Sequence, residues 1–415
     1  MLKRLVLSSA GMVVLTVVGC TTQYEPRTLE VPSQFPTIQS AVDEARPGDI
    51  VSVDGGTYRE SVTITKDQIV IRGKDRNETV LDGEYLRQNG IYVAADGVRV
   101  ENLTVRSFTQ NGIIFSGIDR MSRNHEHSPD DVYGTPGHSL VGYEVQWVTA
   151  YNNGLYGIYA FASSDGVISD SLVSGHPDSG IYIGQCKPCR AVVRRVTAEL
   201  NAIGYYGTNA SGDVYLIESV FRRNRLGIAP NSQEAEALSP QEETVIAGNV
   251  VADNDDPSAP EIPKGFFGGG IVVGGGTKNL IVRNRVVDHS YMGIGVIDFN
   301  RFFAENNTIE ENYVMRNGLD LAYSPGASRS TLGNCFARNT FRTSSPANIE
   351  NVLACGAASA MIQGTALPNS EAPPTVDYRQ IPQPATQPIM PSAEFARPAG
   401  VAAFAKPDLA TIFLP

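Results

Sequence analysis

The sequence repeats Gly157-Ile158-Tyr159-Ala160 about 23 residues later as Gly180-Ile181-Tyr182-Ile183. Further copies of this pattern, a glycine followed by an apolar, a variable and an apolar residue, begin at Gly112, Gly204, Gly227, Gly270, Gly293 and Gly318. A constant period of this length is typical of solenoids, in which each repeat is one coil stacked on the next. Two intervals are about twice as long, and we expect each to hold one atypical or interrupted coil plus a protruding loop, within 120–139 and 253–268.

Each repeat is long enough for three short strands. In one copy, two short runs of alternating apolar residues lie within 98–105, on either side of Asn102, and the glycine strand follows at Gly112-Ile113-Ile114-Phe115. Because side chains alternate across a strand, Ile113 and Phe115 face the interior and Ile114 faces outward. The sequence therefore predicts an all-β protein, a single parallel β-helix with three-strand coils of about 23 residues.

Asparagine and aspartate recur at the turns between these strands. They can adopt the tight turn conformation and also bond neighbouring coils in a ladder, so we expect such a role for Asn102, Asp170, Asn249 and Asn284. We expect the residues two positions after each repeat glycine to form a row that faces outward. These residues are Ile114, Tyr159, Tyr182, Tyr206, Ala229, Val272, Gly295 and Asp320.

A helical pattern precedes the strands. Apolar residues in 36–45 have helical spacing, and Pro47-Gly48 ends the pattern, so we expect a short helix that caps the first coil and covers its strand edges. This opening, with the motif Gly55-Gly56-Thr57-Tyr58-Arg59-Glu60 after it, resembles that of pectin-lyase-like β-helix proteins. The resemblance covers about Val31 to Cys355 and implies a right-handed coil. That superfamily holds lyases, hydrolases, esterases, epimerases and non-catalytic adhesins, so the resemblance implies a fold more than a function.

The first twenty residues have the order of an export signal. Lys3 and Arg4 precede an apolar stretch that ends at Val17-Val18-Gly19-Cys20, and this stretch is short for a membrane span, the alternative interpretation. The segment resembles the lipobox of bacterial lipoproteins, which implies acylation of Cys20 and a protein exported and lipid-anchored to the surface of the bacterial cell envelope. We expect a signal peptide over 1–19, a tether over 20–32, the β-helix over 33–364 and an extended Pro/Ala-rich tail over 365–415.

Charge and cysteine content narrow the function classes. The formal net charge is −11 and no run of basic residues occurs, which argues against a nucleic-acid partner. Besides Cys20 there are four cysteines, and two disulfides, Cys186 with Cys189 and Cys335 with Cys355, are the simplest account in an exported protein. The C-x-x-C spacing also fits a redox motif or half a zinc site, but no second such motif and no following helix pattern accompany it.

Tyrosine occupies the outward row in three successive coils. Coils stack about 4.8 Å apart, so Tyr159, Tyr182 and Tyr206 are expected to form an aromatic strip on which a polysaccharide or other envelope glycan can lie. The alternative is ordinary packing of β-forming residues, or burial beneath the first inserted loop.

Candidates for catalysis lie near this strip. The segment Gly175-His176-Pro177-Asp178 faintly resembles the rung where polygalacturonase-like glycosidases carry paired aspartates, but only Asp178 matches, and Asp165 would have to supply the partner. A turn-forming aspartate is the simpler interpretation. A lyase or epimerase needs a base and a cation beside the sugar carboxylate, and the candidates are His176, Arg223 and Arg225.

The first inserted loop also carries His125, His127 and His138, a set compatible with zinc or copper. Polar loops collect such residues, so we predict no metal site and no cofactor, with calcium as the alternative that is not predicted. The prediction is a monomeric envelope lipoprotein that binds carbohydrate without catalysis, the alternative being a polysaccharide lyase, glycoside hydrolase or uronate epimerase that uses Asp178, His176 and Arg223.

Overall fold

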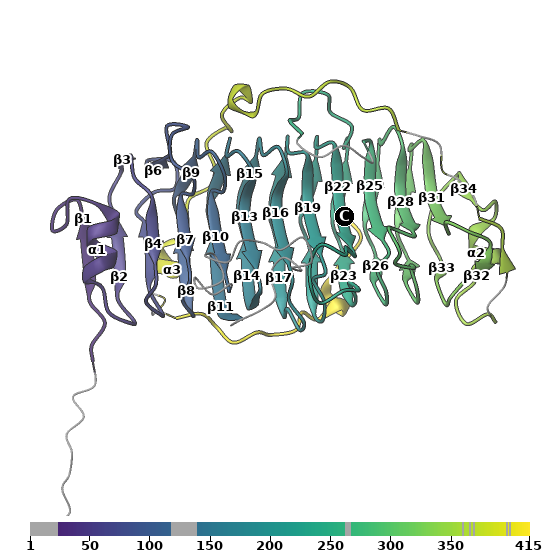
Figure 1. The fold of residues 1–415 in the computed structure, drawn as a ribbon, viewed down its shortest axis with the longest axis horizontal. Helices are drawn as coiled ribbons and strands as arrows, with labels where there is room; N and C mark the ends of the chain where they lie inside the picture. Colours follow the sequence, from purple (N-terminus) through teal and green to yellow (C-terminus); the bar gives the residue numbers. More distant parts are fainter. Residues whose placement is uncertain are drawn as a thin grey trace, which may run out of the picture.

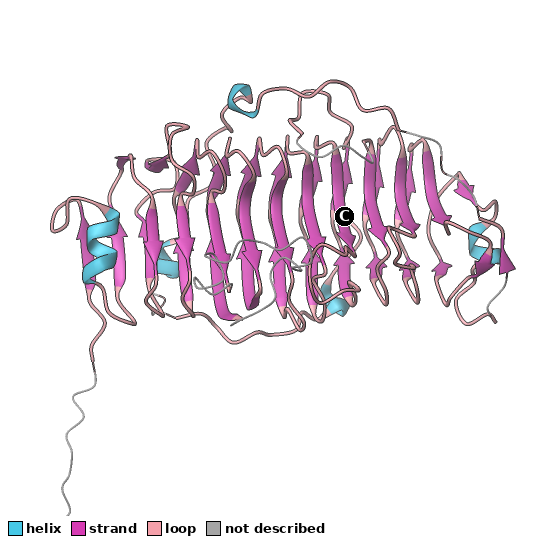
Figure 2. Ribbon diagram, viewed as in Figure 1, coloured by secondary structure: helices cyan, strands magenta, loops and turns pink. Residues whose placement is uncertain are grey.

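The computed structural model describes residues 24–415 except 118–138, 262–266, 359–360, 365–366, 368–369, 396 and 398–399. The chain winds into one elongated solenoid whose coils stack side by side along its length (Figures 1 and 2). Three parallel sheets run along the solenoid and consist, within the described residues, of 12, 11 and 10 strands. Within the same residues no helix has the length and apolar character needed to cross a membrane.

The 12-stranded sheet, called sheet A below, begins at the N-terminal end of the solenoid. Its strands, in spatial order, are β1 Thr28–Val31, β2 Ile50–Val53, β5 Val70–Gly73, β8 Val98–Glu101, β11 Leu140–Gln146, β14 Ser163–Ser169, β17 Ala191–Arg194, β20 Val214–Ile217, β23 Thr244–Ala247, β26 Leu280–Val282, β29 Thr308–Glu310 and β33 Cys335–Ala337.

The 10-stranded sheet, sheet B, follows sheet A in each coil. Its strands are β3 Gly56–Tyr58, β6 Thr79–Asp82, β9 Thr104–Arg106, β12 Thr149–Tyr151, β15 Leu172–Ser174, β18 Thr197–Glu199, β21 Val220–Arg222, β24 Val250–Ala252, β27 Arg285–Val287 and β30 Tyr313–Met315.

The 11-stranded sheet, sheet C, holds the repeat glycines and the tyrosines. Its strands are β4 Val62–Ile64, β7 Ile91–Val93, β10 Ile113–Ser116, β13 Tyr156–Phe161, β16 Ser179–Gly184, β19 Ile203–Thr208, β22 Leu226–Asn231, β25 Gly269–Gly274, β28 Met292–Ile297, β31 Leu319–Ser324 and β34 Ser344–Ser345. The three-strand coil predicted from the repeat is therefore confirmed.

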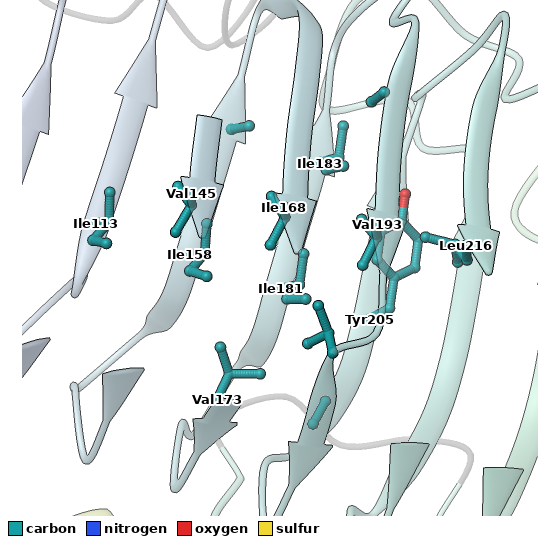
Figure 3. Close-up of a cluster of buried hydrophobic side chains, with 14 of the residues drawn as sticks. Ile113, Val145, Ile158, Ile168, Val173, Ile181, Ile183, Val193, Tyr205 and Leu216 are labelled. Carbon is teal, nitrogen blue, oxygen red and sulfur yellow. The ribbon is translucent and has the colours of Figure 1, made fainter. Parts of the chain in front are cut away.

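The core is a continuous column of apolar side chains inside the coils (Figure 3). Ile113, Ile158 and Ile181 occupy equivalent positions on neighbouring strands of sheet C, and all three are fully buried. Val145, Ile168 and Val193 do the same in sheet A. Like residues therefore stack on like residues, which buries one elongated core as a solenoid requires.

The repeat glycines are explained by a ladder of polar side chains inside the turn that precedes sheet C. Asn201 Nδ2 donates to Asn224 Oδ1 at 3.0 Å, and Asn224 Nδ2 donates to Asn254 Oδ1 at 2.8 Å. A Cβ atom on Gly204 or Gly227 would lie 3.1 or 2.9 Å from the amide nitrogen of the next ladder residue, and closer still to a carbonyl oxygen. Only glycine leaves room for the ladder.

The other turns confirm most of the expected asparagine positions. Asn249 Nδ2 donates to Asn284 Oδ1 at 2.9 Å in a second ladder, and Asn102 has the positive φ of a tight turn and donates to the carbonyl of Gly73. Asp170 also has a positive φ, but its carboxylate points away from the interior and pairs with Arg195 at 2.7 Å. It is a turn residue without a place in a ladder.

The two long intervals between repeat glycines are single coils. β10 pairs directly with β13, and β22 pairs directly with β25, so the additional residues are insertions between strands. One inserted stretch, Ser232 to Glu243, lies between β22 and β23. The outward row also differs at its last member, because β31 places Ala322, and not Asp320, beside Gly295. Asp320 takes the place of a repeat glycine and ends the ladder by accepting from Asn317 at 3.0 Å.

Short helices close the two ends. α1, Ile38–Glu44, is the predicted capping helix, and Thr37 and Ser40 form a capping box at its start. β1 belongs to sheet A, so the solenoid begins inside the segment expected to be a tether. At the other end lie α2, Ile349–Val352, and an antiparallel pair, β32 Arg329–Ser330 with β35 Met361–Ile362. The structure contains both expected disulfides, Cys186–Cys189 and Cys335–Cys355.

The C-terminal tail runs back along the solenoid and then returns, as the yellow trace in Figure 1 shows. Its short elements are η2 Tyr378–Gln380, α3 Ser392–Phe395 and η3 Leu409–Thr411. Ile381, Met390 and Ile412 are almost fully buried, and the carbonyl of Ile381 accepts from Asn152 at 2.8 Å. The tail is therefore a docked strap that covers parts of sheets A and B.

Candidate functional site

Four tyrosines gather on the outer face of sheet C. Tyr159, Tyr182 and Tyr206 are neighbours on β13, β16 and β19, as the repeat predicts, and Tyr156 stacks on Tyr159 with ring centroids 4.7 Å apart. The Tyr182 ring lies 5.0 Å from Tyr159 and 5.9 Å from Tyr206. Tyr159 and Tyr182 are buried, whereas Tyr156 and Tyr206 are partly exposed. The strip is therefore largely covered and does not form an open aromatic surface.

Two carboxyl groups meet these tyrosines. Asp178, directly before β16, interacts with the Tyr156 hydroxyl. Glu236, in the insertion after β22, accepts a 2.5 Å hydrogen bond from the Tyr182 hydroxyl. We call Asp178, Glu236, Tyr156, Tyr159, Tyr182 and Tyr206 the tyrosine–carboxylate cluster.

Both acidic residues are partly exposed, yet each has one buried oxygen that finds no hydrogen-bond partner among the described residues, Oδ1 of Asp178 and Oε2 of Glu236. Burial raises the pKa of Asp178 to about 6, against a smaller opposing effect of hydrogen bonding from Tyr156. Burial likewise raises the pKa of Glu236 to about 7, with the Tyr182 hydroxyl opposing it. Within the described chain, no cation contributes to either pKa.

The position of Glu236 depends on Asn209, a buried residue just after β19. Asn209 Nδ2 donates to the backbone carbonyls of Gln233, Glu236 and Ala237 at 2.9, 3.0 and 3.1 Å, and Oδ1 accepts from the amide of Gln233 at 3.0 Å. Gln233 in turn donates to the Tyr206 hydroxyl at 2.5 Å. One asparagine therefore folds the inserted loop back over the tyrosines.

Comparisons with known proteins agree with this architecture. The family described as the right-handed beta helix region matches residues 135–314. The A-module of the Azotobacter vinelandii mannuronan C-5 epimerase AlgE4 superposes with a TM-score of 0.51 at 14% identity, over 74% of this chain and 91% of that one. XylC, solved in a complex with xylose, superposes with a TM-score of 0.53 at 9% identity, over 74% of this chain and 73% of that one.

The fold is a right-handed parallel β-helix. The pectate lyase Pel9A matches with a lower TM-score of 0.44 at 14% identity, over 73% of this chain and 71% of that one. At such identities the likeness establishes the architecture alone. A comparison with curated proteins finds no match.

The β-helix does not bring the three predicted catalytic residues together. His176 is fully buried in the ladder, where Nδ1 lies 2.7 Å from Asn201 Oδ1 and Nε2 lies 3.2 Å from Asn153 Nδ2. Burial lowers its pKa to about 4. Arg223 is exposed at the turn after β21 and donates to Asp256 at 2.8 Å. Asp178 alone lies in the cluster.

The two other residues considered for chemistry are also engaged elsewhere. Asp165 pairs with Arg190 at 2.5 Å on the side of sheet A. Arg225 is buried, pairs with Glu261 at 2.9 Å and lies over the Phe267 ring. Neither reaches the cluster, and both have structural partners.

Some sequence predictions fall outside the described residues. These are Cys20, which is predicted to carry the lipid, and the loop histidines His125, His127 and His138. Within the described residues no group of three or more metal-binding side chains converges.

Glu236 is not among the site residues predicted from the sequence. It lies 54 residues from Tyr182, in an irregular loop without a motif. The available signal was the long interval between Gly227 and Gly270, which holds this insertion as well as the one after β24. The cluster therefore combines two carboxyl groups, whose pKa values are raised to about 6 and about 7, with four phenol groups, a set that can transfer protons.

Proposed function

We propose that the protein is a polysaccharide-active enzyme that hydrolyses a glycosidic bond at the tyrosine–carboxylate cluster. The observation that carries the proposal is the pair Asp178 and Glu236, two carboxyls with raised pKa values and one unpartnered buried oxygen each. Glycoside hydrolysis needs two such groups in different protonation states. The lipobox-like segment ending at Cys20 extends the proposal to an activity at the membrane surface of the cell envelope.

The two pKa values assign the roles. Glu236, with a pKa of about 7, keeps its proton longer and donates it to the glycosidic oxygen as that bond breaks. Asp178, with a pKa of about 6, ionises first and takes a proton from the attacking water. One water is consumed: its hydroxyl joins the anomeric carbon and its other proton goes to Asp178. Proton exchange with solvent then returns Asp178 to the carboxylate and Glu236 to the acid, so the net reaction is addition of one water across the bond.

The tyrosines supply binding. Tyr156 and Tyr206 are partly exposed, so their rings can pack against the apolar face of a sugar while their hydroxyls exchange hydrogen bonds with it. Tyr159 and Tyr182 lie beneath them and hold the floor rigid. The partner in this proposal is a glycan.

A second reaction is favoured by the pairing of each carboxyl with a phenol. A carboxylate that shares a proton with a tyrosine can also remove the proton beside a sugar carboxylate, as a lyase or an epimerase must. The Asp178 contact with Tyr156 is the observation behind this candidate. The two reactions differ in product, because a lyase leaves an unsaturated sugar that absorbs ultraviolet light.

The first prediction tests both reactions. The purified protein is incubated with neutral and uronic cell-wall polysaccharides, with and without calcium, and products are followed by reducing ends and ultraviolet absorbance. We expect hydrolysis, and a rate lower by at least about 100-fold in Asp178→Asn and in Glu236→Gln, because each variant removes one proton-transfer group.

The matched control is Asp170→Asn, which removes a carboxylate paired with Arg195 outside the cluster and leaves the rate within about twofold of the original. Glycan binding without any product would contradict the hydrolase and favour a non-catalytic envelope module. An unsaturated product would contradict hydrolysis and favour the lyase.

A further inference from the structure

A pocket lies on the outer face of sheet C, toward the C-terminal end of the solenoid. This pocket has a volume of about 540 Å³, and its floor is formed by Met292 of β28 and Leu319 of β31. Phe267 and Tyr291 form aromatic walls, and the docked tail adds Leu367, Ser370 and Glu371. The volume and the mixture of aromatic and polar groups are those of small-molecule sites.

Arg225 holds the walls of this pocket together. The guanidinium is buried, pairs with Glu261 at 2.9 Å, and lies over the Phe267 ring at 4.9 Å from the ring centroid. It also donates to the carbonyl of Pro373 in the tail at 2.6 Å. The hydroxyl oxygen of Thr375 accepts from the amide of Glu261 at 2.7 Å, a second link between tail and solenoid. The pocket is therefore built by a buried cation that joins three separate segments.

The pocket shares one row of outward positions with the tyrosine–carboxylate cluster. Ser179, next to Asp178, is followed on successive strands of sheet C by Ile203, Leu226, Gly269, Met292 and Leu319. Met292 is four strands from Ser179, which corresponds to about 19 Å at the usual strand spacing. Tyr206 of the cluster and Tyr291 of the pocket also pack against the same group of apolar residues.

We propose that this pocket is a distal sugar-binding subsite, which takes a neutral sugar of the same glycan whose bond lies at the cluster. The proposal rests on the proposed function for the identity of the ligand as a glycan. It makes the enzyme one that recognises a chain spanning several coils, and it gives the docked tail a role, because the tail supplies one wall.

The lining indicates the class of sugar. Tyr291 offers a partly exposed ring for stacking against a sugar face, and Ser290, Ser370 and Glu371 offer oxygens for sugar hydroxyls. Glu371 is the charged side chain among the described lining residues, and no Lys or Arg lines the pocket with it. A uronate in this pocket would meet a carboxylate without a compensating cation, so a neutral sugar is favoured.

The test measures binding against chain length. An array of neutral and uronic cell-wall oligosaccharides, from disaccharide to octasaccharide, identifies ligands, and calorimetry then gives Kd for the full-length protein and for Tyr291→Ala. We expect affinity to rise once the neutral chain is long enough to span both sites, and Tyr291→Ala to lose about tenfold in affinity for long chains and nothing for short ones.

The control variant is Tyr313→Ala, which removes a partly exposed tyrosine of sheet B whose ring packs against the Arg285 guanidinium. This variant should leave the affinities for long and for short chains unchanged. Equal binding of long chains by the Tyr291→Ala variant, or no binding of any oligosaccharide, overturns the subsite. If long chains bind through Tyr291 but no glycan is cleaved, the hydrolase fails and the subsite stands. If Asp178→Asn abolishes cleavage while Tyr291→Ala leaves long-chain binding intact, the subsite fails and the hydrolase stands.

Discussion

Asp178 and Glu236 keep buried oxygens that lack hydrogen-bond partners among the described residues, an arrangement that costs folding free energy. Carboxylates elsewhere on the coils avoid this cost by pairing with arginine, as Asp165 does with Arg190. Groups kept in such an unfavourable state concentrate where proton transfer occurs. The environment of these two residues is therefore a better indication of function than their identity in the sequence.

The second prediction concerns the pH dependence of catalysis. Asp178 must be ionised, so kcat/KM rises as pH increases through about 6, and Glu236 must be protonated, so kcat/KM falls as pH increases through about 7. The result is a narrow bell with its maximum between these two pKa values. Measuring kcat/KM from pH 4 to 9 checks this, and a flat profile would exclude the pair as the acid and base.

The third prediction assigns Asn209 as a positioning residue. Its φ is +48°, which glycine also adopts, so Asn209→Gly deletes the four side-chain hydrogen bonds without straining the backbone. The loop should then release Glu236 into water, and its pKa should fall from about 7 toward its ordinary 4.5. We expect the alkaline limb of the pH profile to move to lower pH, with a loss of about 2 kcal/mol in stability.

The comparison for this variant is Asn306→Gly, an exposed residue with a φ of +55° in a turn far from the cluster. It should leave the profile unchanged. Carbon NMR titration of Glu236 gives the same answer without a substrate, so an unshifted Glu236 pKa in Asn209→Gly would disprove the positioning role.

At the scale of elements, the polar ladder explains why glycine recurs at the start of sheet C strands. The side-chain oxygen of a ladder residue accepts from both the backbone amide and the side-chain amide of the rung in the preceding coil, as Asn224 Oδ1 does from Asn201. Most rungs are asparagine, but His176 and His289 replace it in two coils, and both are buried with their pKa lowered to about 4 by burial. A neutral imidazole can donate and accept, and therefore mimics an amide.

The fourth prediction follows from these histidines. In the unfolded chain they bind a proton below about pH 6.5, whereas in the fold they resist it down to about 4. Stability is therefore lost as pH falls through this range, by up to about 3 kcal/mol for each ring. Replacing both with asparagine should flatten the fall in unfolding free energy between pH 7 and 4, as measured by denaturant titration. An unchanged slope would show that the rings do not titrate.

Sequence periodicity predicted the elements well and the site only in part. The period, the interior residues such as Ile113 and the row of tyrosines follow from local alternation, which stacking preserves from coil to coil. Asp320 was misplaced because the pattern Gly318-Leu319 shifts by two residues relative to Gly293. Glu236 was missed because an insertion brings it to Tyr182 through tertiary contacts, which no local pattern encodes.

At the scale of the whole molecule, the tail is a strap that joins coils far apart in the solenoid. A solenoid coil contacts only its neighbours, so its stability depends on nearest-neighbour interfaces. The tail adds long-range contacts, from the pocket at β28 to Arg72 on β5 and back to Arg283 beside β26. On sheet A it covers a group of buried charges, Arg72, Arg99, Glu101 and Glu144.

The last prediction tests this strap at Arg397, whose guanidinium donates to both carboxylate oxygens of Glu144 at 3.0 and 3.1 Å. In the Arg397→Ala variant, the ion pair left to Glu144 is the one with Arg99 at 4.0 Å. Burial then disfavours the negative charge of the Glu144 carboxylate. Arg397→Ala should lower the free energy of unfolding by about 2 kcal/mol and expose the tail to protease.

The control variant is Lys406→Ala, which breaks an exposed pair with Asp213 and should lower the free energy of unfolding by less than about 0.5 kcal/mol. Because Leu367 and Glu371 lie upstream of the Arg397 contact and are held separately by Arg225, sugar binding at the pocket should survive Arg397→Ala. Equal protease resistance of the Arg397→Ala and Lys406→Ala variants would mean that the tail docks through its apolar contacts alone.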